Sequence, residues 1–185
     1  MPQTLVKEFK ARAEKAVEHL KGTYQGVRTG RAHPALVEDI KVDYFGTLTP
    51  IKQMGTVNTP EPRQIVITPW DKTALKAIQK AIQTSSLGVN PQVDSDVVRL
   101  SLPELTRERR VDLTKLVNKY AEEGRIAIRN TRREFIDVLK KMEKDSEISE
   151  DDLKKYQKEI QDVTDEAIKK VDQICAEKEK EIMDE

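Results

Sequence analysis

The sequence predicts an α+β protein: a long antiparallel three-helix bundle that carries a small inserted β/α/β domain on a two-strand hinge. Three stretches have apolar residues spaced by three or four positions, which is typical of helices that bury one face. All but one of the eight prolines lie between the first two of these stretches. Because proline disrupts long helices and suits turns and strand edges, we assign residues 1–30 and 105–185 to the bundle and residues 31–104 to the inserted domain.

The first helix is predicted over residues 1–29. Pro2 suits a first helical turn. Gly30 is expected to end the helix, because glycine adopts a positive φ at little steric cost. The predicted apolar face comprises Leu5, Phe9, Ala13, Ala16, Leu20, Tyr24 and Val27.

Short strands and one helix are predicted for the inserted domain. Asp71 can cap the helix, and Leu87 and Gly88 are expected to close it. Trp70 is expected to be a packing anchor rather than a stacking platform. Alternating or continuous apolar residues indicate strands at 40–44, 65–67 and 98–102, with a turn at 45–47.

The longest helical stretch, residues 105–144, contains no helix breaker and is expected to have two different faces. The first face is apolar and packs against neighbouring helices. The second is rich in arginine and extends over roughly 30 Å from Arg110 to Arg132, at 1.5 Å per residue. That length exceeds a small-molecule pocket and suits a polyanion. The apolar face is predicted to contain Leu113, Val117, Tyr120, Gly124, Ile128, Thr131, Phe135, Val138 and Met142, and the basic face Arg107, Arg110, Arg125, Arg129, Arg132 and Arg133.

A third helix is predicted from Ser149 to the end of the chain. Ser149 suits the N-cap position, acidic residues follow in the first turn, and Ile148 can pack against Leu153. Its predicted apolar face comprises Leu153, Tyr156, Ile160, Val163, Ala167, Val171 and Ile174.

The arginine-rich face suggests recognition of phosphates on folded RNA. Arginine is used there in preference to lysine, and its planar guanidinium suits bidentate phosphate contacts. An antiparallel bundle would also bring Arg28 near Arg107 and Arg110. The alternative is a solvated face whose arginines pair with nearby carboxylates. Those carboxylates would be Glu122, Asp137 or Glu143.

Nothing in the sequence indicates an enzyme, a cofactor or a metal site. No phosphate-binding loop is present, and His19, His33 and Cys175 are too few to bind zinc. Cys175 is expected to be a small core residue. The net charge is zero, with 33 basic and 33 acidic residues. A single cysteine and the lack of a long apolar run favour a cytoplasmic protein that does not enter a membrane.

Several segments, in order along the whole chain, resemble the bacterial ribosome recycling factor family. The match includes the residues around the expected domain junctions and those in the centre of the long helix. The segments are 27–32 (VRTGRA), 44–46 (YFG), 69–72 (PWDK), 87–91 (LGVNP), 105–110 (LTRERR) and 129–133 (RNTRR).

The resemblance implies an L-shaped protein that binds the ribosome after termination. With elongation factor G, which hydrolyses GTP, such proteins separate the subunits and release messenger RNA and deacylated transfer RNA. The arginine face would contact the RNA of the large subunit, and the partner factor would move the smaller domain. The RNA-contact residues implied are Arg132 first, then Arg28, Arg110 and Arg129, followed by Arg107, Arg125 and Arg133; the hinge would comprise Gly30, Arg31, Pro103 and Glu104.

The sequence departs from the family pattern at three positions. Ser95 occupies a turn where many members have glycine, Glu104 replaces a second proline in the hinge, and Phe135 is larger than expected.

A monomer is expected. The competing class is a coiled-coil-like adapter or scaffold without RNA binding, which explains the helical pattern but not the preference for arginine.

Overall fold

The structure, a computed structural model, describes residues 1–184 and divides into two compact units. The first unit, the bundle, comprises Met1–Tyr24 and Asp112–Asp184. The second, the inserted unit, comprises Gln25–Val111. Residues 25–30 and 105–111, which we assigned to the bundle, therefore group with the inserted unit. One cause is that the first helix ends at Gln25 rather than near residue 29, so the chain leaves the bundle before Gly30.

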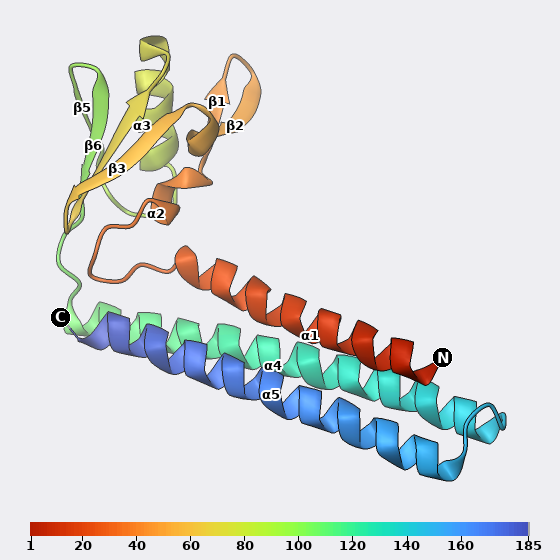
Figure 1. The fold of residues 1–185 in the computed structure, drawn as a ribbon. Coiled ribbons are helices and arrows are strands. Elements are labelled where there is room, and N and C mark those ends of the chain that lie inside the picture. Colours follow the sequence, from red (N-terminus) through yellow and green to blue (C-terminus); the bar gives the residue numbers. More distant parts are fainter. Residues whose placement is uncertain (185) are drawn as a thin grey trace. The chain divides into compact units, whose positions relative to one another are not determined.

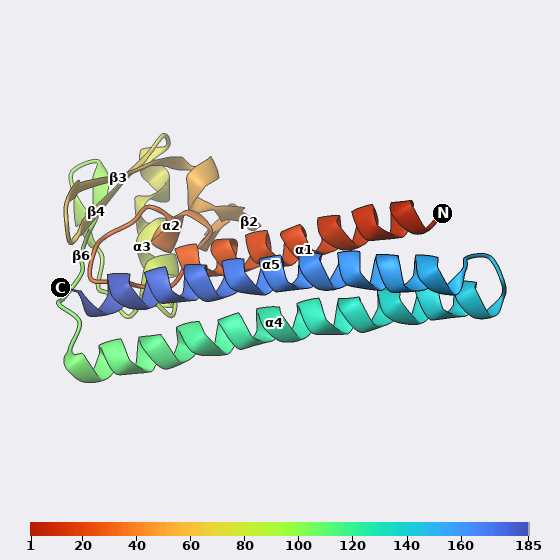
Figure 2. The same ribbon diagram turned by 60° about the horizontal axis from the view of Figure 1, so that its bottom comes forward.

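Three long helices run side by side in the bundle, with α4 antiparallel to both α1 and α5 (Figures 1 and 2). They are α1 (Pro2–Gln25), α4 (Arg107–Lys144) and α5 (Glu150–Met183). The predicted start of α5 is confirmed, because the Ser149 hydroxyl accepts a hydrogen bond from the Asp152 amide at 3.0 Å. The Ser149 amide in turn donates to the Asp152 carboxylate at 3.3 Å, which completes a capping box.

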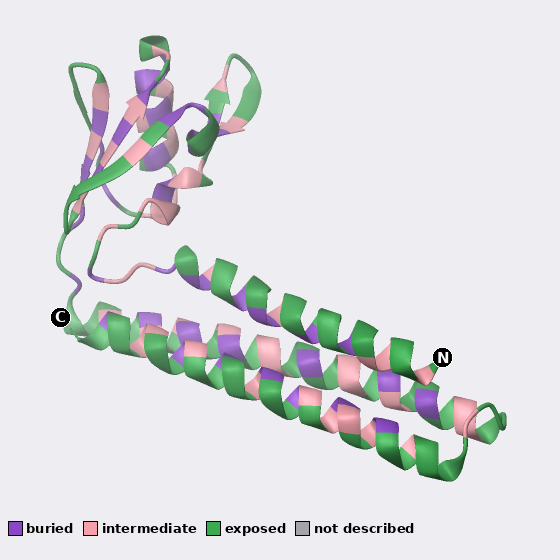
Figure 3. Ribbon diagram, viewed as in Figure 1, coloured by how far each residue is buried: buried purple, intermediate pink, exposed green. Residues whose placement is uncertain are grey.

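Buried residues, purple in Figure 3, recur along each of the three helices. Near the α4–α5 turn, the rings of Phe9 and Phe135 lie 5.5 Å apart in a tilted arrangement. The predicted face of α4 is wrong at Val138, which is 44% exposed, whereas Leu139 is fully buried. The buried line steps by four from Phe135, because strict steps of three rotate away from the core in a helix of 3.6 residues per turn. On α4 the buried residues are Leu113, Val117, Ala121, Ile128, Phe135 and Leu139.

The inserted unit combines a four-stranded antiparallel sheet, a separate two-stranded hairpin and one helix of nine residues. The sheet order is β3-β4-β6-β5, and β1 pairs only with β2. The strands are β1 (Lys41–Tyr44), β2 (Thr47–Pro50), β3 (Gly55–Glu61), β4 (Gln64–Pro69), β5 (Gln92–Asp94) and β6 (Val97–Ser101). The helices are α2 (Ala35–Glu38) and α3 (Leu75–Gln83), with 3-10 turns η1 (Ile51–Gln53) and η2 (Lys72–Ala74).

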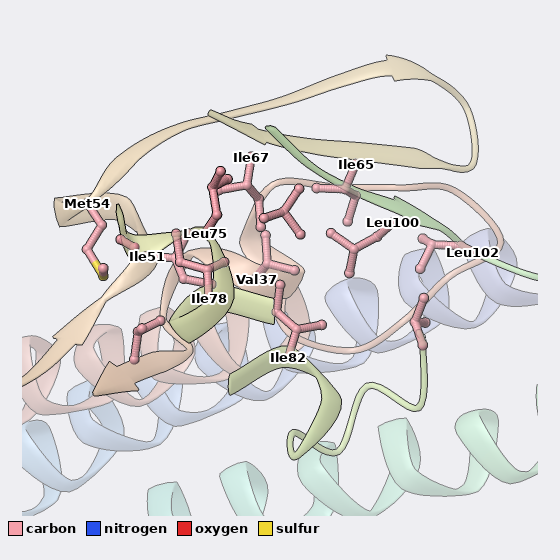
Figure 4. Close-up of a cluster of buried hydrophobic side chains, with 14 residues drawn as sticks. Val37, Ile51, Met54, Ile65, Ile67, Leu75, Ile78, Ile82, Leu100 and Leu102 are labelled. Carbon is pink, nitrogen blue, oxygen red and sulfur yellow. The ribbon is translucent and has the colours of Figure 1, made fainter. Parts of the chain in front are cut away.

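The core of the inserted unit is aliphatic and lies between α3, the sheet and the hairpin (Figure 4). Alternate residues of β4, beginning with Ile65 and Ile67, point into it, as do Val98 and Leu100 of β6. Asp71 caps the η2 turn before α3, as predicted, by accepting from the Thr73 amide at 2.9 Å.

Two expectations for the inserted unit are wrong. Trp70 is not a packing anchor but is 71% exposed. It follows Ile65, Ile67 and Pro69, which are buried, so the two-residue period of the strand turns the next side chain outward. The helix does not extend to Gly88 but ends at Gln83, and Gly88 lies in the following loop.

Two turns of the inserted unit place residues other than glycine in the left-handed region. At the β1–β2 turn, Phe45 has φ +50° and precedes Gly46 at φ +82°. Ser95, between β5 and β6, has φ +51°. A positive φ is unfavourable for a residue with a Cβ atom, so glycine, which the family resemblance predicts at position 95, suits this backbone better than serine.

We expect Ser95→Gly to stabilise the inserted unit by about 0.5–1 kcal/mol, because it removes the strain of a left-handed serine. Urea denaturation followed through the amide NMR signals of β5 and β6 would measure the change. Ser101→Gly is the matched control in the extended β6 strand and should destabilise the unit by about 0.5–1 kcal/mol. A loss of stability in both variants would mean that Ser95 is not strained.

Candidate nucleic-acid interface

Six arginines of α4 form what we call the arginine face. At about 100° per residue, most of them lie on one flank of the helix, beside the line of buried residues and extending toward solvent. Arg107, Arg129 and Arg133 are exposed, whereas Arg110, Arg125 and Arg132 are partly buried. The face comprises Arg107, Arg110, Arg125, Arg129, Arg132 and Arg133.

Arg132 has a buried guanidinium nitrogen that lacks a partner. Arg132 lies four residues after Ile128 and three before Phe135, both buried, and therefore on the same side of α4 as these two residues. The Nε atom is buried and makes no hydrogen bond. Within the described chain, no carboxylate lies within 4 Å of this guanidinium. A buried donor without a partner costs free energy, and an external anion could satisfy it.

The contacts between α4 and α5 explain why the Arg132 guanidinium has no carboxylate partner. Asn118 of α4 donates to Glu179 of α5. Seven residues later on α4, and seven residues earlier on the antiparallel α5, Arg125 donates to Asp172. The same spacing brings Asp165 to the level of Arg132. Its carboxylate instead accepts a hydrogen bond from the Gln161 side-chain amide at 2.8 Å.

Arg125 differs from Arg132, because its donors are occupied within the bundle. Its Nε and Nη2 atoms lie 2.8 and 2.7 Å from the Asp172 carboxylate, and Nη1 lies 3.0 Å from Glu122. Burial alone would lower the pKa of Arg125, but the bonds to Asp172 and Glu122 outweigh it and raise that pKa. The side chain is only 20% exposed. Arg125 thus joins α4 to α5. Sequence reasoning named Glu122 as a possible partner but missed Asp172, because nothing in the pattern fixes the register between the helices.

Arg129 and Arg133 lie one turn from Arg125 and two turns from it, respectively, on the exposed side of the arginine face. Arg129 Nη1 lies 3.4 Å from the second oxygen of Glu122. Arg133 and Arg107 have no carboxylate within 4 Å among residues 1–184. The face therefore contains both paired and unpaired guanidinium groups.

Arg28 and Arg110 belong to the inserted unit by the division above. The Arg28 Nη2 atom donates to the Pro103 carbonyl, and its Nε atom is buried without a partner. Burial lowers the pKa of Arg28, and the nearby charge of Arg109 lowers it further. Arg110 Nε donates to the Leu105 carbonyl at 3.4 Å. Arg28 is thus bonded to the second connecting segment of the chain, a contact that the sequence pattern did not predict.

The described residues contain no cluster that could hold a metal ion, and their cysteine is buried. No group of three His, Cys, Asp or Glu side chains within residues 1–184 could hold a metal ion. Cys175 is buried, as expected for a core residue, and burial raises the pKa of its thiol. None of the described helices combines the length and apolar character needed to cross a bilayer.

Comparison with known proteins identifies the family. Residues 20–183 match the ribosome recycling factor family. The chain is 51% identical to the ribosome-recycling factor of Halothermothrix orenii over 184 residues, with all of both chains covered. It is 49% identical to that of Thermus thermophilus over 179 residues, covering 97% of each chain.

Solved structures agree with this result. A solution structure of a ribosome recycling factor is 44% identical, with a TM-score of 0.79 over 100% of this chain and 98% of the other. A second match, with 48% identity and a TM-score of 0.68, covers 99% of each chain. It is the Thermus thermophilus factor in models of that factor and Escherichia coli elongation factor G bound to the E. coli post-termination complex. The chain belongs to the ribosome recycling factor family, whose members are translation factors and not enzymes.

We expect Arg125→Met to reduce the free energy of unfolding of the bundle by about 1 kcal/mol. The variant keeps the apolar stem but removes three charge-assisted contacts, whose value is limited by the exposure of both carboxylates. Arg133→Met, at an exposed position without a carboxylate, should change stability by less than about 0.5 kcal/mol. Urea denaturation followed by helical circular dichroism would compare them. Equal changes in the free energy of unfolding for the two variants would show that the packing of α4 against α5 does not depend on Arg125.

Proposed function

We propose that this chain is a ribosome recycling factor that binds the post-termination ribosome in the cytoplasm. With elongation factor G, and with GTP hydrolysed by that factor, it separates the subunits and releases messenger RNA and deacylated transfer RNA. Family membership over the full chain supports this function over the adapter or scaffold alternative. The related Thermus thermophilus factor, described together with elongation factor G on a post-termination complex, supports the choice of partner.

We further propose that the arginine face of α4 contacts phosphates of large-subunit ribosomal RNA. The observation that carries this proposal is the half-buried Arg132, whose Nε lacks a partner and whose guanidinium has no carboxylate nearby. Burial of the Nε atom restricts the side chain before binding, which lowers the entropy cost of ordering it. A phosphate oxygen would satisfy the unpaired donor and form a charge-assisted hydrogen bond.

The remaining arginines then have different roles. Arg107, Arg129 and Arg133 are exposed and are proposed as phosphate contacts beside Arg132. Arg110 is proposed as a further contact at the start of α4. Arg125 and Arg28 act mainly through the protein in this proposal, because their guanidinium groups bind Asp172 and the Pro103 carbonyl.

We expect Arg132→Ala to weaken binding to purified large ribosomal subunits about tenfold. It should also reduce the slope of log affinity against log salt concentration by about one unit, because one phosphate contact is lost. Equilibrium binding at several salt concentrations would measure both quantities. Arg99→Ala is the charge-matched control, since Arg99 lies on β6 of the inserted unit and pairs with Asp94 at 3.2 Å. If the two variants bind alike, Arg132 does not contact RNA.

The connecting segments are proposed to allow movement of the inserted unit. The Ala32 amide donates to the Pro62 carbonyl at 2.6 Å and the Leu102 amide donates to the Arg63 carbonyl at 2.8 Å. Arg63 also pairs with Glu104 at 2.7 Å. These bonds tie both segments to the β3–β4 turn, so the parts around Arg31, Pro103 and Glu104 would move with the inserted unit. Bending would then concentrate nearer the helix ends, including Gly30.

Gly30→Pro should leave large-subunit binding within about twofold of the parent chain but slow subunit splitting, because proline fixes φ and restricts the residue before it. Light scattering of post-termination ribosomes with elongation factor G and GTP would give the splitting rate. Gly30→Ala is the control for side-chain bulk, because Gly30 is buried. A normal rate for Gly30→Pro would show that bending at this position is not needed.

A further inference from the structure

Four charged residues form a continuous chain of ion pairs from α5 to the exposed edge of the arginine face. Asp172 of α5 binds Arg125, Arg125 binds Glu122, and Glu122 binds Arg129. The two oxygens of Glu122 are divided between its partners, with Oε2 lying 3.0 Å from Arg125 and Oε1 lying 3.4 Å from Arg129. The four residues carry two positive and two negative charges, so together they have no net charge.

The two arginines in this chain of ion pairs differ in how many contacts hold them. Arg125 is largely buried and uses Nε, Nη1 and Nη2 in contacts with Asp172 and Glu122. Arg129 is 47% exposed and shows one long contact through Nη1. An exposed pair with a single contact is weak, whereas several short contacts around a partly buried guanidinium are stronger. The Glu122–Arg129 pair is therefore the one that opens first when another anion approaches.

We propose that Glu122 is an internal competitor for RNA phosphate, which releases Arg129 when the chain binds ribosomal RNA and pairs with it again on dissociation. This inference rests on the proposed contact between Arg129 and RNA. It assigns Glu122 a role in setting affinity and release, although Glu122 itself does not contact RNA in a favourable way.

Arg125 makes the exchange reversible. When Arg129 turns to a phosphate, Glu122 keeps its 3.0 Å contact with Arg125, so its carboxylate is not left without a cation. Because Arg125 is fixed in turn by Asp172, Glu122 stays on the same flank of α4. The carboxylate therefore remains close enough to repel phosphate and to recapture Arg129, a local electrostatic effect that salt screens.

Arg132 provides the contrast. It has no carboxylate within 4 Å in the described part of the chain, so its contact with phosphate would need no exchange. The face thus combines guanidinium groups without a carboxylate partner, such as that of Arg132, with the Arg129 guanidinium, which must first leave an internal partner. Such a combination limits the total affinity, which suits a factor that must leave the ribosome after each cycle.

Glu122→Gln should tighten binding of the full chain to purified large subunits by about three- to fivefold, the range expected for removing one exposed pair. The gain should appear mainly as a slower dissociation rate. In recycling assays with limiting chain, repeated rounds of splitting should slow, whereas a single round should keep its rate.

Glu123→Gln is the matched control, because Glu123 is the neighbouring exposed glutamate and has no ion pair among residues 1–184. It removes the same charge and should change the affinity by less than about 1.5-fold. Glu122→Ala is a second test variant, since Arg125 keeps Asp172 when the carboxylate is lost.

Arg129→Ala separates this inference from the proposed function on which it rests. Arg129→Ala alone should weaken binding, and in that background Glu122→Gln should no longer tighten it. If Arg129→Ala has no effect, the proposed RNA contact of Arg129 is wrong. If Arg129→Ala weakens binding but the Glu122 variants tighten it no more than Glu123→Gln does, or still tighten it without Arg129, the competitor role is wrong.

Discussion

The Arg125–Asp172 ion pair marks one alignment of α4 against α5. A long apolar seam can slide by one turn at little cost in buried area, whereas a guanidinium with three occupied nitrogens has one good position. The Asn118–Glu179 contact, seven residues away on both helices, repeats the same alignment. With this register set, Arg132 lies beside the core and Arg129 lies at the edge. Polar contacts between α4 and α5 and the burial of apolar residues thus both contribute to the packing of this bundle.

Much of the fold could be predicted from the sequence because its signals are local. The spacing of Phe9, Leu20 and Tyr24, the capping residues Ser149 and Asp71, and the alternation along β4 depend only on near neighbours. The errors arose where the apolar spacing or the length of a helix was extrapolated over several residues. Val138 was assigned to the core by a three-residue step from Phe135 where the buried residue, Leu139, lies four residues on. The helix α1 was extended to a glycine that lies five residues beyond its end.

The candidate site was only partly predictable, because a row of arginines does not reveal which guanidinium groups are already occupied. Arg125 and Arg132 are seven residues apart and look equivalent in the sequence, yet one is fully paired and the other has an unpaired buried nitrogen. The difference comes from α5, where Asp172 points to Arg125 but Asp165 binds Gln161. Such choices depend on contacts between helices, which no pattern within one helix records.

The exposure of Trp70 has a consequence for how the two units can be observed. The only tryptophan lies in the inserted unit, so the tryptophan emission of the chain comes from that unit alone. Far-ultraviolet circular dichroism instead reports mainly on α1, α4 and α5, which contain 24, 38 and 34 residues. The two signals therefore follow different halves of the molecule. Transitions that do not coincide would reflect two units that unfold separately, even where each is itself two-state.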